Sequence, residues 1–149
     1  MAGIEVAVND ATLFTLLGSC VGVILYDSHC RIGSLAHIVL PDSRGKSSEL
    51  IGKFVDTAIP KMIQLIRDAG GNFNSLNARI AGGANMFNTE SGETVGSQNL
   101  FATQTLLESL GIPILGRHCG GDQGRRVTFE VNSGRVFVEQ VGIEGRIEI

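Results

Sequence analysis

Two apolar runs joined by a short polar link constrain the fold of this chain more than any other feature. The first run, Val21–Tyr26, is rich in β-branched residues and ends on an aromatic one, and the second run is Ile32–Leu40. Both compositions are typical of β-strands. The link contains Asp27–Cys30, which is polar and short, so the whole segment predicts a β-hairpin.

The register of this hairpin decides whether Cys20 and His37 face each other. A two-residue loop at Ser28 and His29 would place Cys20 directly opposite His37, with their Cβ atoms about 4.5–5.5 Å apart. At that separation an imidazole can take a proton from a thiol. A three-residue loop or a bulge would place Ile38 opposite Cys20 instead. We take the two-residue loop as the working prediction.

Strand-like segments recur along the rest of the chain. The predicted strands are Ile4–Val8, Leu13–Leu17, Val21–Tyr26, Ile32–Leu40, Ala78–Ala81, Ile112–Arg117, Arg126–Glu130 and Arg135–Gln140. The turn residues Asn132-Ser133-Gly134 predict that the last two strands form a hairpin.

Two segments have helical periodicity. The first is predicted to start near Ser47-Ser48-Glu49 and to end at Gly70-Gly71, with a kink at Pro60. Its apolar stripe is Ile51, Val55, Ala58, Met62, Leu65 and Ile66. The second spans about Gly96–Leu110, and its inward residues are Leu100, Thr103, Leu106, Leu107 and Leu110. Many strands with two helices predict an α+β fold, in which helices pack on a sheet-rich core.

Composition excludes several classes of protein. At 149 residues with 43% hydrophobic and 18% charged residues, the chain is predicted to form one globular domain over 1–149. The net charge of −3 and the scattered basic residues argue against a nucleic-acid surface. Apolar stretches stay short of the roughly 18 residues that a membrane span needs, so we expect no membrane insertion.

The terminus and the cysteines indicate a cytoplasmic protein. Met1–Glu5 lacks the basic and apolar regions of a secretory signal. Three cysteines, an odd number without framework spacing, fit a reducing compartment better than a disulfide scaffold.

Cys20 is the leading candidate for a nucleophile. A free thiol is a weak nucleophile until it loses its proton, and a paired imidazole shifts it toward the thiolate. Gly18 and Ser19 precede Cys20 and allow a tight backbone whose N–H groups face the sulfur and a developing oxyanion. We therefore expect His37 to act on Cys20, with Gly18 and Ser19 as oxyanion- or substrate-binding residues.

Structural interpretations compete with these roles. Cys20 can be a small buried apolar residue, and His37 can be a core histidine that bonds a backbone carbonyl. The pair His118-Cys119 beside a glycine pair is a rival catalytic candidate, although neighbouring strand residues point to opposite faces. The cysteine and histidine spacings lack a zinc-binding element, so no metal site is predicted.

Three glycine clusters punctuate the strands. They are Gly82-Gly83-Ala84, Gly92 with Gly96, and Gly120-Gly121 with Gly124. Turn geometry and close chain approach explain such clusters better than ligand contact does. None has the pattern of a phosphate-binding loop.

Five motifs, in order and over nearly the whole chain, resemble the CheD family of chemoreceptor glutamine deamidases. They are Leu17-Gly18-Ser19-Cys20-Val21, Gly33-Ser34-Leu35-Ala36-His37-Ile38-Val39-Leu40-Pro41, Ala81-Gly82-Gly83-Ala84-Asn85-Met86-Phe87, Gly96-Ser97-Gln98-Asn99 and Gly120-Gly121-Asp122-Gln123-Gly124-Arg125. The first two are the most specific of the five.

The resemblance implies a cytoplasmic, cofactor-independent enzyme that converts glutamine side chains of methyl-accepting chemoreceptors into glutamate and ammonia through a cysteine thioester. It implies a layered α/β/β sandwich with mostly antiparallel strands, similar to the catalytic domain of cytotoxic necrotising factors. The family's nucleophile falls on Cys20 and its general base on His37. Its third member is a threonine six residues before the cysteine, where this chain has Phe14. A one-residue deletion in the turn would assign the role to Thr15.

The resemblance also implies a second partner, the CheC phosphatase, which competes with receptors. An alternative function is therefore a non-catalytic adaptor that binds and modulates CheC. A papain-type peptidase is disfavoured, because Cys20 and His37 lie only 17 residues apart. The sequence alone leaves the role of His118 and Cys119 open.

Overall fold

The computed structural model of the protein describes residues 3–45, 50–87 and 92–149. The strands are β1 (Gly3–Val8), β2 (Thr12–Leu17), β3 (Val21–Asp27), β4 (Ile32–Ile38), β5 (Leu76–Gly82), β6 (Ile114–Cys119), β7 (Arg125–Glu130), β8 (Arg135–Gln140) and β9 (Ile147–Glu148). The helices are α1 (Val55–Asp68) and α2 (Val95–Ser109), with short 3-10 turns η1 (Ile51–Lys53) and η2 (Phe73–Ser75).

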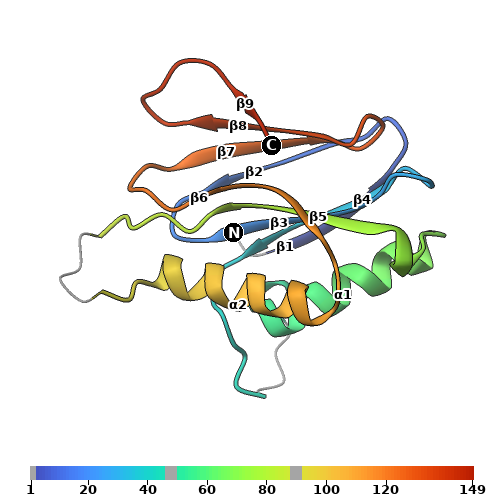
Figure 1. Cartoon of the computed structure of the whole chain (residues 1–149), viewed down its shortest axis with the longest axis horizontal. Coiled ribbons are helices and arrows are strands. Elements are labelled where there is room, and N and C mark those ends of the chain that lie inside the picture. The colour runs from blue at the N-terminus through green and yellow to red at the C-terminus, as the bar shows by residue number, and fades with distance from the viewer. Residues whose placement is uncertain (1–2, 46–49, 88–91) are drawn as a thin grey trace.

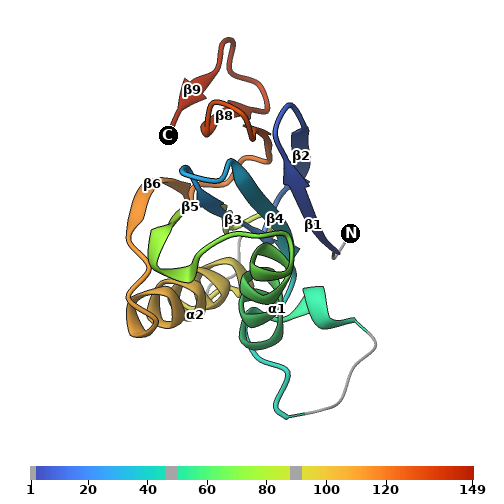
Figure 2. The ribbon, with the colours of Figure 1, turned by 90° about the vertical axis from the view of Figure 1, so that its right-hand side faces the viewer.

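These strands form two sheets. The first has the order β1-β4-β3-β5-β6 and is antiparallel except for the parallel pair β5–β6. The second has the order β2-β7-β8-β9 and is antiparallel throughout. Both helices cover one face of the five-stranded sheet, and the four-stranded sheet covers the other face (Figures 1 and 2). The α+β prediction with two helices and mostly antiparallel strands is confirmed.

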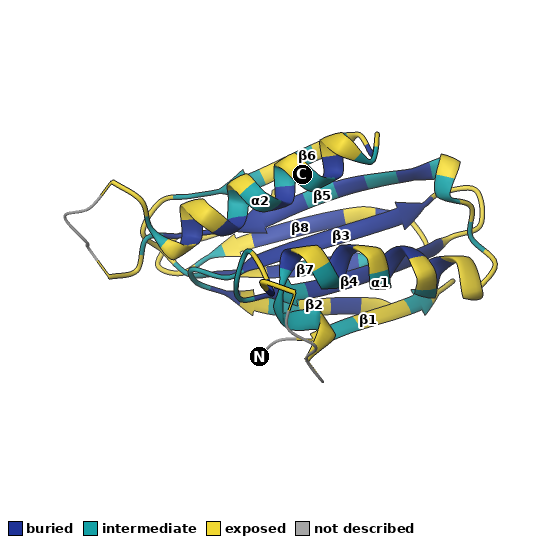
Figure 3. Ribbon diagram, turned by 90° about the horizontal axis from the view of Figure 1, so that it is seen from below, coloured by how far each residue is buried: buried dark blue, intermediate teal, exposed yellow. Residues whose placement is uncertain are grey.

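The five-stranded sheet carries an apolar core on each face. Val21, Val23 and Leu25 of β3 pack toward the helices, whereas Ile24 and Tyr26 pack toward the second sheet. The strand is therefore buried along its whole length, as Figure 3 shows. Covering both faces explains why its sequence reads as a continuous apolar run rather than an alternating one.

The predicted strands are found within two residues of their expected ends. The largest difference that matters for the site is in β4, which ends at Ile38 rather than Leu40. It ends there because the N–H groups of Val39 and Leu40 both donate to the carbonyl of Lys53, at 2.9 and 3.0 Å. The chain therefore leaves the ladder directly after His37 and Ile38. The predicted hairpin between β7 and β8 is confirmed.

Helix α1 begins later than predicted. Ser47-Ser48-Glu49 lies outside the described residues, and α1 starts at Val55 behind Phe54, which is extended and pairs with Leu40. Ile51, expected in the helical stripe, lies in η1 and is exposed. Pro60 does lie inside α1, and the helix ends just before Gly70, as predicted.

Helix α2 matches its prediction to within one residue. Thr94 and Ser97 form a reciprocal capping box at its start, which satisfies backbone donors that have no partner within the helix. The buried residues of the helix are Gly96, Asn99, Thr103 and Leu107. The predicted inward residues Leu100, Leu106 and Leu110 pack at the margin of the core instead.

Candidate active site

The predicted register of the β3–β4 hairpin is wrong by two residues. His37 is opposite Gly22, and the last pair of the ladder is Val21 with Ile38. Cys20 lies just beyond this pair and is opposite no residue of β4. A shift of two residues leaves the side-chain faces unchanged, so Cys20 stays on the same face as His37.

The loop between the two strands causes this shift. It has four residues rather than two, because the ladder closes at Asp27 and Ile32. The Asp27 carboxylate accepts hydrogen bonds from the backbone N–H groups of His29, Cys30 and Asn72, at 3.0, 3.2 and 2.8 Å. These bonds favour the wider turn and hold the pKa of Asp27 below its usual range, although burial of the carboxyl acts in the opposite direction.

His37 is bonded to Thr15 across the space between the two sheets. Thr15 lies in β2 between Leu13 and Leu17, which both face the inner core of the sandwich. Its Oγ1 is 2.8 Å from Nδ1 of His37. Phe14, at the alternative position, points to the outer face and is 60% exposed. The structure therefore places Thr15, and not Phe14, against the imidazole.

Gly22 provides the space in which this contact forms. It faces the inner core opposite His37, and a Cβ atom there would press on the side chain of Leu17 and come within 3.7 Å of Thr15. A larger residue at this position would push the two sheets apart beside the imidazole.

Cys20 lies in a turn formed by Gly18, Ser19 and Cys20, here called the 18–20 turn. Each of its three carbonyl groups accepts a hydrogen bond from another part of the chain. Ala84 N–H donates to Gly18 at 3.0 Å and Gly83 N–H donates to Cys20 at 2.8 Å. Asn99 of α2 donates its side-chain amide to Ser19 at 3.3 Å.

The N–H groups of the same turn are unused. Among the described residues, neither Ser19 nor Cys20 donates a backbone hydrogen bond. A turn with fixed carbonyls and free N–H groups beside a thiol has the donors that an oxyanion would need.

Glycines allow the turn to be approached this closely. Gly82 and Gly83 both have positive φ, and a Cβ on Gly82 would collide with the carbonyl oxygen of Cys20. A Cβ on Gly96 would press on the carbonyl oxygens of Gly83 and Ala84. The prediction that turn geometry and close approach of the chain explain the Gly82-Gly83 cluster is confirmed.

Burial keeps both candidate catalytic groups neutral. It raises the pKa of the half-buried Cys20 thiol and lowers the pKa of the His37 imidazole. No hydrogen bond joins these two side chains, both of which lie in the described part of the chain. The resting protein therefore favours a thiol and a neutral imidazole, in contrast to the thiolate that a direct pair would produce.

The rival pair His118-Cys119 is separated by the sheet. Cys119 packs on the helix side and donates its thiol to the carbonyl of Ile80 at 3.5 Å. His118 instead contacts the Arg125 guanidinium, with Nδ1 and Nη1 2.8 Å apart. Burial and this guanidinium lower the pKa of His118. The two side chains do not form a dyad, and Arg125 also bonds the carbonyls of Gly120 and Gln123.

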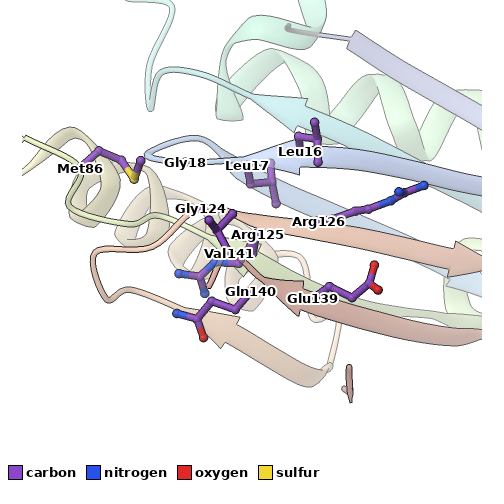
Figure 4. Close-up of a pocket in the computed structure, with 10 residues that line it drawn as sticks. All are labelled: Leu16, Leu17, Gly18, Met86, Gly124, Arg125, Arg126, Glu139, Gln140 and Val141. Carbon is purple, nitrogen blue, oxygen red and sulfur yellow. The ribbon is translucent and has the colours of Figure 1, made fainter. Parts of the chain in front are cut away.

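Arg125 also borders a cleft beside the 18–20 turn. The cleft measures about 470 Å³, and Figure 4 shows its lining. Its lining residues are Leu16, Leu17, Gly18, Met86, Gly124, Arg125, Arg126, Glu139, Gln140 and Val141. Met86 also lines a second cavity of about 190 Å³, which is bounded by Ser19 and the start of α2. Gly18 therefore lines one of these hollows and Ser19 lines the other.

The described part of the chain contains no candidate metal site. No group of three or more His, Cys, Asp or Glu side chains there is placed to hold a metal ion. Within residues 3–45, 50–87 and 92–149, no helix is both long and apolar enough to cross a membrane.

Sequence reasoning did not identify Asn99 as a site residue. It sits in the Gly96-Ser97-Gln98-Asn99 motif, and a polar residue on the inward stripe of a helix is the signal that could have identified it.

Fold and site define a three-layer α/β/β protein with a thiol and a threonine-bonded imidazole at one end of its two sheets. The family model described as "CheD chemotactic sensory transduction" matches residues 39–140. A "Probable chemoreceptor glutamine deamidase CheD" of Methanococcus maripaludis is 40% identical over 94% of this chain and 92% of its own length. The "Chemoreceptor glutamine deamidase CheD" of Thermotoga maritima is 37% identical over 95% and 89%. A probable deamidase of that name from Clostridium botulinum is 38% identical over 96% and 91%.

The chain belongs to the CheD family. The relatives span Cys20 and His37, whereas the family-model match begins two residues after His37.

The raised thiol pKa predicts slow alkylation of Cys20 in the folded protein. At pH 7 iodoacetamide should label Cys20 more slowly than it labels the same residue in the urea-unfolded chain, because less thiolate is present. The rate should rise about tenfold per pH unit up to about pH 9. Peptide mapping by mass spectrometry measures it, with Cys20 of the urea-unfolded chain as the reference. Faster labelling of Cys20 in the folded than in the unfolded chain at pH 6.5 would contradict the raised pKa of the Cys20 thiol.

Proposed function

We propose that this protein hydrolyses the side-chain amide of selected glutamines on methyl-accepting chemoreceptors, giving glutamate and ammonia. The relatives named as chemoreceptor glutamine deamidases support the reaction and its substrate. The observation that carries the assignment of residues is the 18–20 turn, which has fixed carbonyls and free N–H groups and contains Cys20 itself.

In the first half-reaction the sulfur of Cys20 attacks the amide carbon of glutamine. His37 Nε2 takes the thiol proton, and the N–H groups of Ser19 and Cys20, after Gly18, stabilise the oxyanion. When the tetrahedral intermediate collapses, the C–N bond breaks and His37 gives its proton to the leaving nitrogen. Ammonia departs and a thioester remains on Cys20.

In the second half-reaction water is the nucleophile. His37 removes a proton from water, the hydroxide adds to the thioester carbonyl, and the same N–H groups stabilise the second oxyanion. The C–S bond then breaks and Cys20 recovers a proton from His37. The sum is one amide and one water converted into one carboxyl group and one ammonia, without any cofactor.

Thr15 orients the base in this scheme. With Nδ1–H of His37 donating to Oγ1 of Thr15, the Nε2 lone pair is free to accept the thiol proton. The neutral imidazole that burial favours is the form that a general base requires. Catalytic hydrogen bonds often tighten only when substrate binds, so the lack of a direct Cys20–His37 bond in the free protein fits this scheme.

Several further properties of the family belong to the same proposal. Residues 1–149 form one CheD-like catalytic domain, since β3 and β4 contribute to both apolar cores. Its sandwich is similar to the catalytic domain of cytotoxic necrotising factors. It acts in the cytoplasm, without nucleic acid or membrane insertion, on receptor signalling helices, and it binds a CheC-type phosphatase. The adaptor alternative keeps CheC binding without catalysis.

Removal of either catalytic side chain should abolish deamidation. Cys20→Ala and His37→Gln are each expected to lower the rate by about 10³-fold or more, because each removes a group that the chemical step needs. Each deamidation adds about one dalton, so intact-mass spectrometry of a purified receptor cytoplasmic domain measures it. Cys30→Ala, at an exposed cysteine, is the matched control and should retain full activity. Wild-type rates for Cys20→Ala would favour the adaptor function.

Loss of the hydrogen bond between Thr15 and His37 should lower kcat and leave substrate affinity unchanged. Thr15→Val keeps the shape of the side chain but loses the bond to His37, so kcat should fall about 10- to 100-fold with little change in KM. Thr15→Ser keeps the hydroxyl and should retain most of the activity. Equal kcat values for the valine and serine variants would refute an orienting role.

A further inference from the structure

The hydrogen-bond ladder between β3 and β4 stops just where the candidate catalytic residues lie. Its last pair is Val21 with Ile38, one residue after Cys20 and one residue after His37. Beyond it the two strands no longer pair, because the N–H groups of Val39 and Leu40 both donate to Lys53 instead. Backbone pairing therefore does not link the 18–20 turn to the end of the strand that carries His37.

The side chain of Asn99 bridges this gap. Its Nδ2 donates to the carbonyl of Ser19 at 3.3 Å and to the carbonyl of Val39 at 2.9 Å. Both carbonyls are acceptors, and a side-chain amide nitrogen has two N–H donors to offer them. Asn99 is fully buried, so water cannot replace these bonds.

The position of α2 makes the bridge possible. Gly96, one turn before Asn99, packs directly against the carbonyl oxygens of Gly83 and Ala84. Residues three apart lie on one face of a helix, so this close approach carries Asn99 to the 18–20 turn. The capping box at Thr94 fixes the start of the helix at the same point.

The bond to Ser19 also sets the direction of a catalytic donor. The carbonyl of Ser19 and the N–H of Cys20 belong to one planar peptide unit, and no cis peptide occurs among the described residues. In a trans unit these two groups point in opposite directions. A donor that fixes the Ser19 carbonyl toward α2 therefore aims the free Cys20 N–H away from α2.

We propose that Asn99 is a positioning residue that aligns the Cys20 N–H as an oxyanion donor and links the 18–20 turn to the strand bearing His37. The proposal rests on the proposed deamidase function and assigns Asn99 no contact with substrate. Its expected signature is a loss of transition-state stabilisation with intact ground-state binding, because the donor matters most when the oxyanion forms.

Thr103 provides a matched control for burial on the same helix. It lies one turn after Asn99, is also fully buried, and its hydroxyl has no partner among the described residues. A purely structural role of α2 would make substitutions at the two positions similar in their effect on kcat.

The test compares three variants on a purified receptor cytoplasmic domain, at a temperature where circular dichroism shows each to be folded. Asn99→Asp keeps the shape of the side chain and replaces the amide that carries both N–H donors with a carboxyl group. Asn99→Ser is smaller, and its hydroxyl can bond a carbonyl one turn earlier in its own helix, so the new side chain has a partner of its own. Thr103→Ala is the control.

Both Asn99 variants should lower kcat by about 10- to 100-fold and change KM less than about threefold. Thr103→Ala should keep kcat within about twofold of wild type. Asn99 variants with the kcat of Thr103→Ala, in a protein whose Cys20→Ala variant is inactive, would overturn the role of Asn99 alone. An active Cys20→Ala variant would instead overturn the proposed function, on which the role of Asn99 rests.

Discussion

Three hydrogen bonds to the carbonyls of Gly18, Ser19 and Cys20 are the interactions on which the site depends. A peptide unit is rigid, so each fixed carbonyl also fixes the direction of the N–H that follows it. The donors are Gly83 and Ala84, just after β5, and Asn99 in α2, and all three lie far from the turn in the sequence. Gly82 and Gly96 let these elements approach because a Cβ on either would collide with a backbone oxygen. These bonds orient the 18–20 turn and leave the N–H groups of Ser19 and Cys20 free.

The packing of the two sheets supplies the second half of the site. Thr15 comes from the four-stranded sheet and His37 from the five-stranded sheet, so their bond exists only when the sandwich is closed. The same burial disfavours charge on both His37 and Cys20. In the proposed mechanism, a neutral imidazole and a protonated thiol are suited to proton transfer during attack, when the substrate has displaced water from the site.

Local patterns predicted most of the fold, and non-local bonds decided the rest. Alternation and turn residues identified β1 to β8 to within two residues, and Gly70 marks a helix end that the chain does use. The hairpin register depended on Asp27, whose carboxylate bonds include one from Asn72, and no local rule anticipates that contact. Thr15 could be placed from the alternation of Leu13 and Leu17, whereas the bridging role of Asn99 depends on where α2 packs.

The most direct measurement of the central claim is acid quenching of the reaction followed by intact-mass and peptide analysis. A synthetic receptor peptide with a single glutamine would be mixed with the protein and quenched within the first turnover. The thioester account predicts a protein–peptide adduct lighter than the sum of its parts by one ammonia, about 17 daltons, and mapping to Cys20. Deamidation that proceeds with the adduct on Cys119, or with product formed by a Cys20→Ala variant, would contradict it.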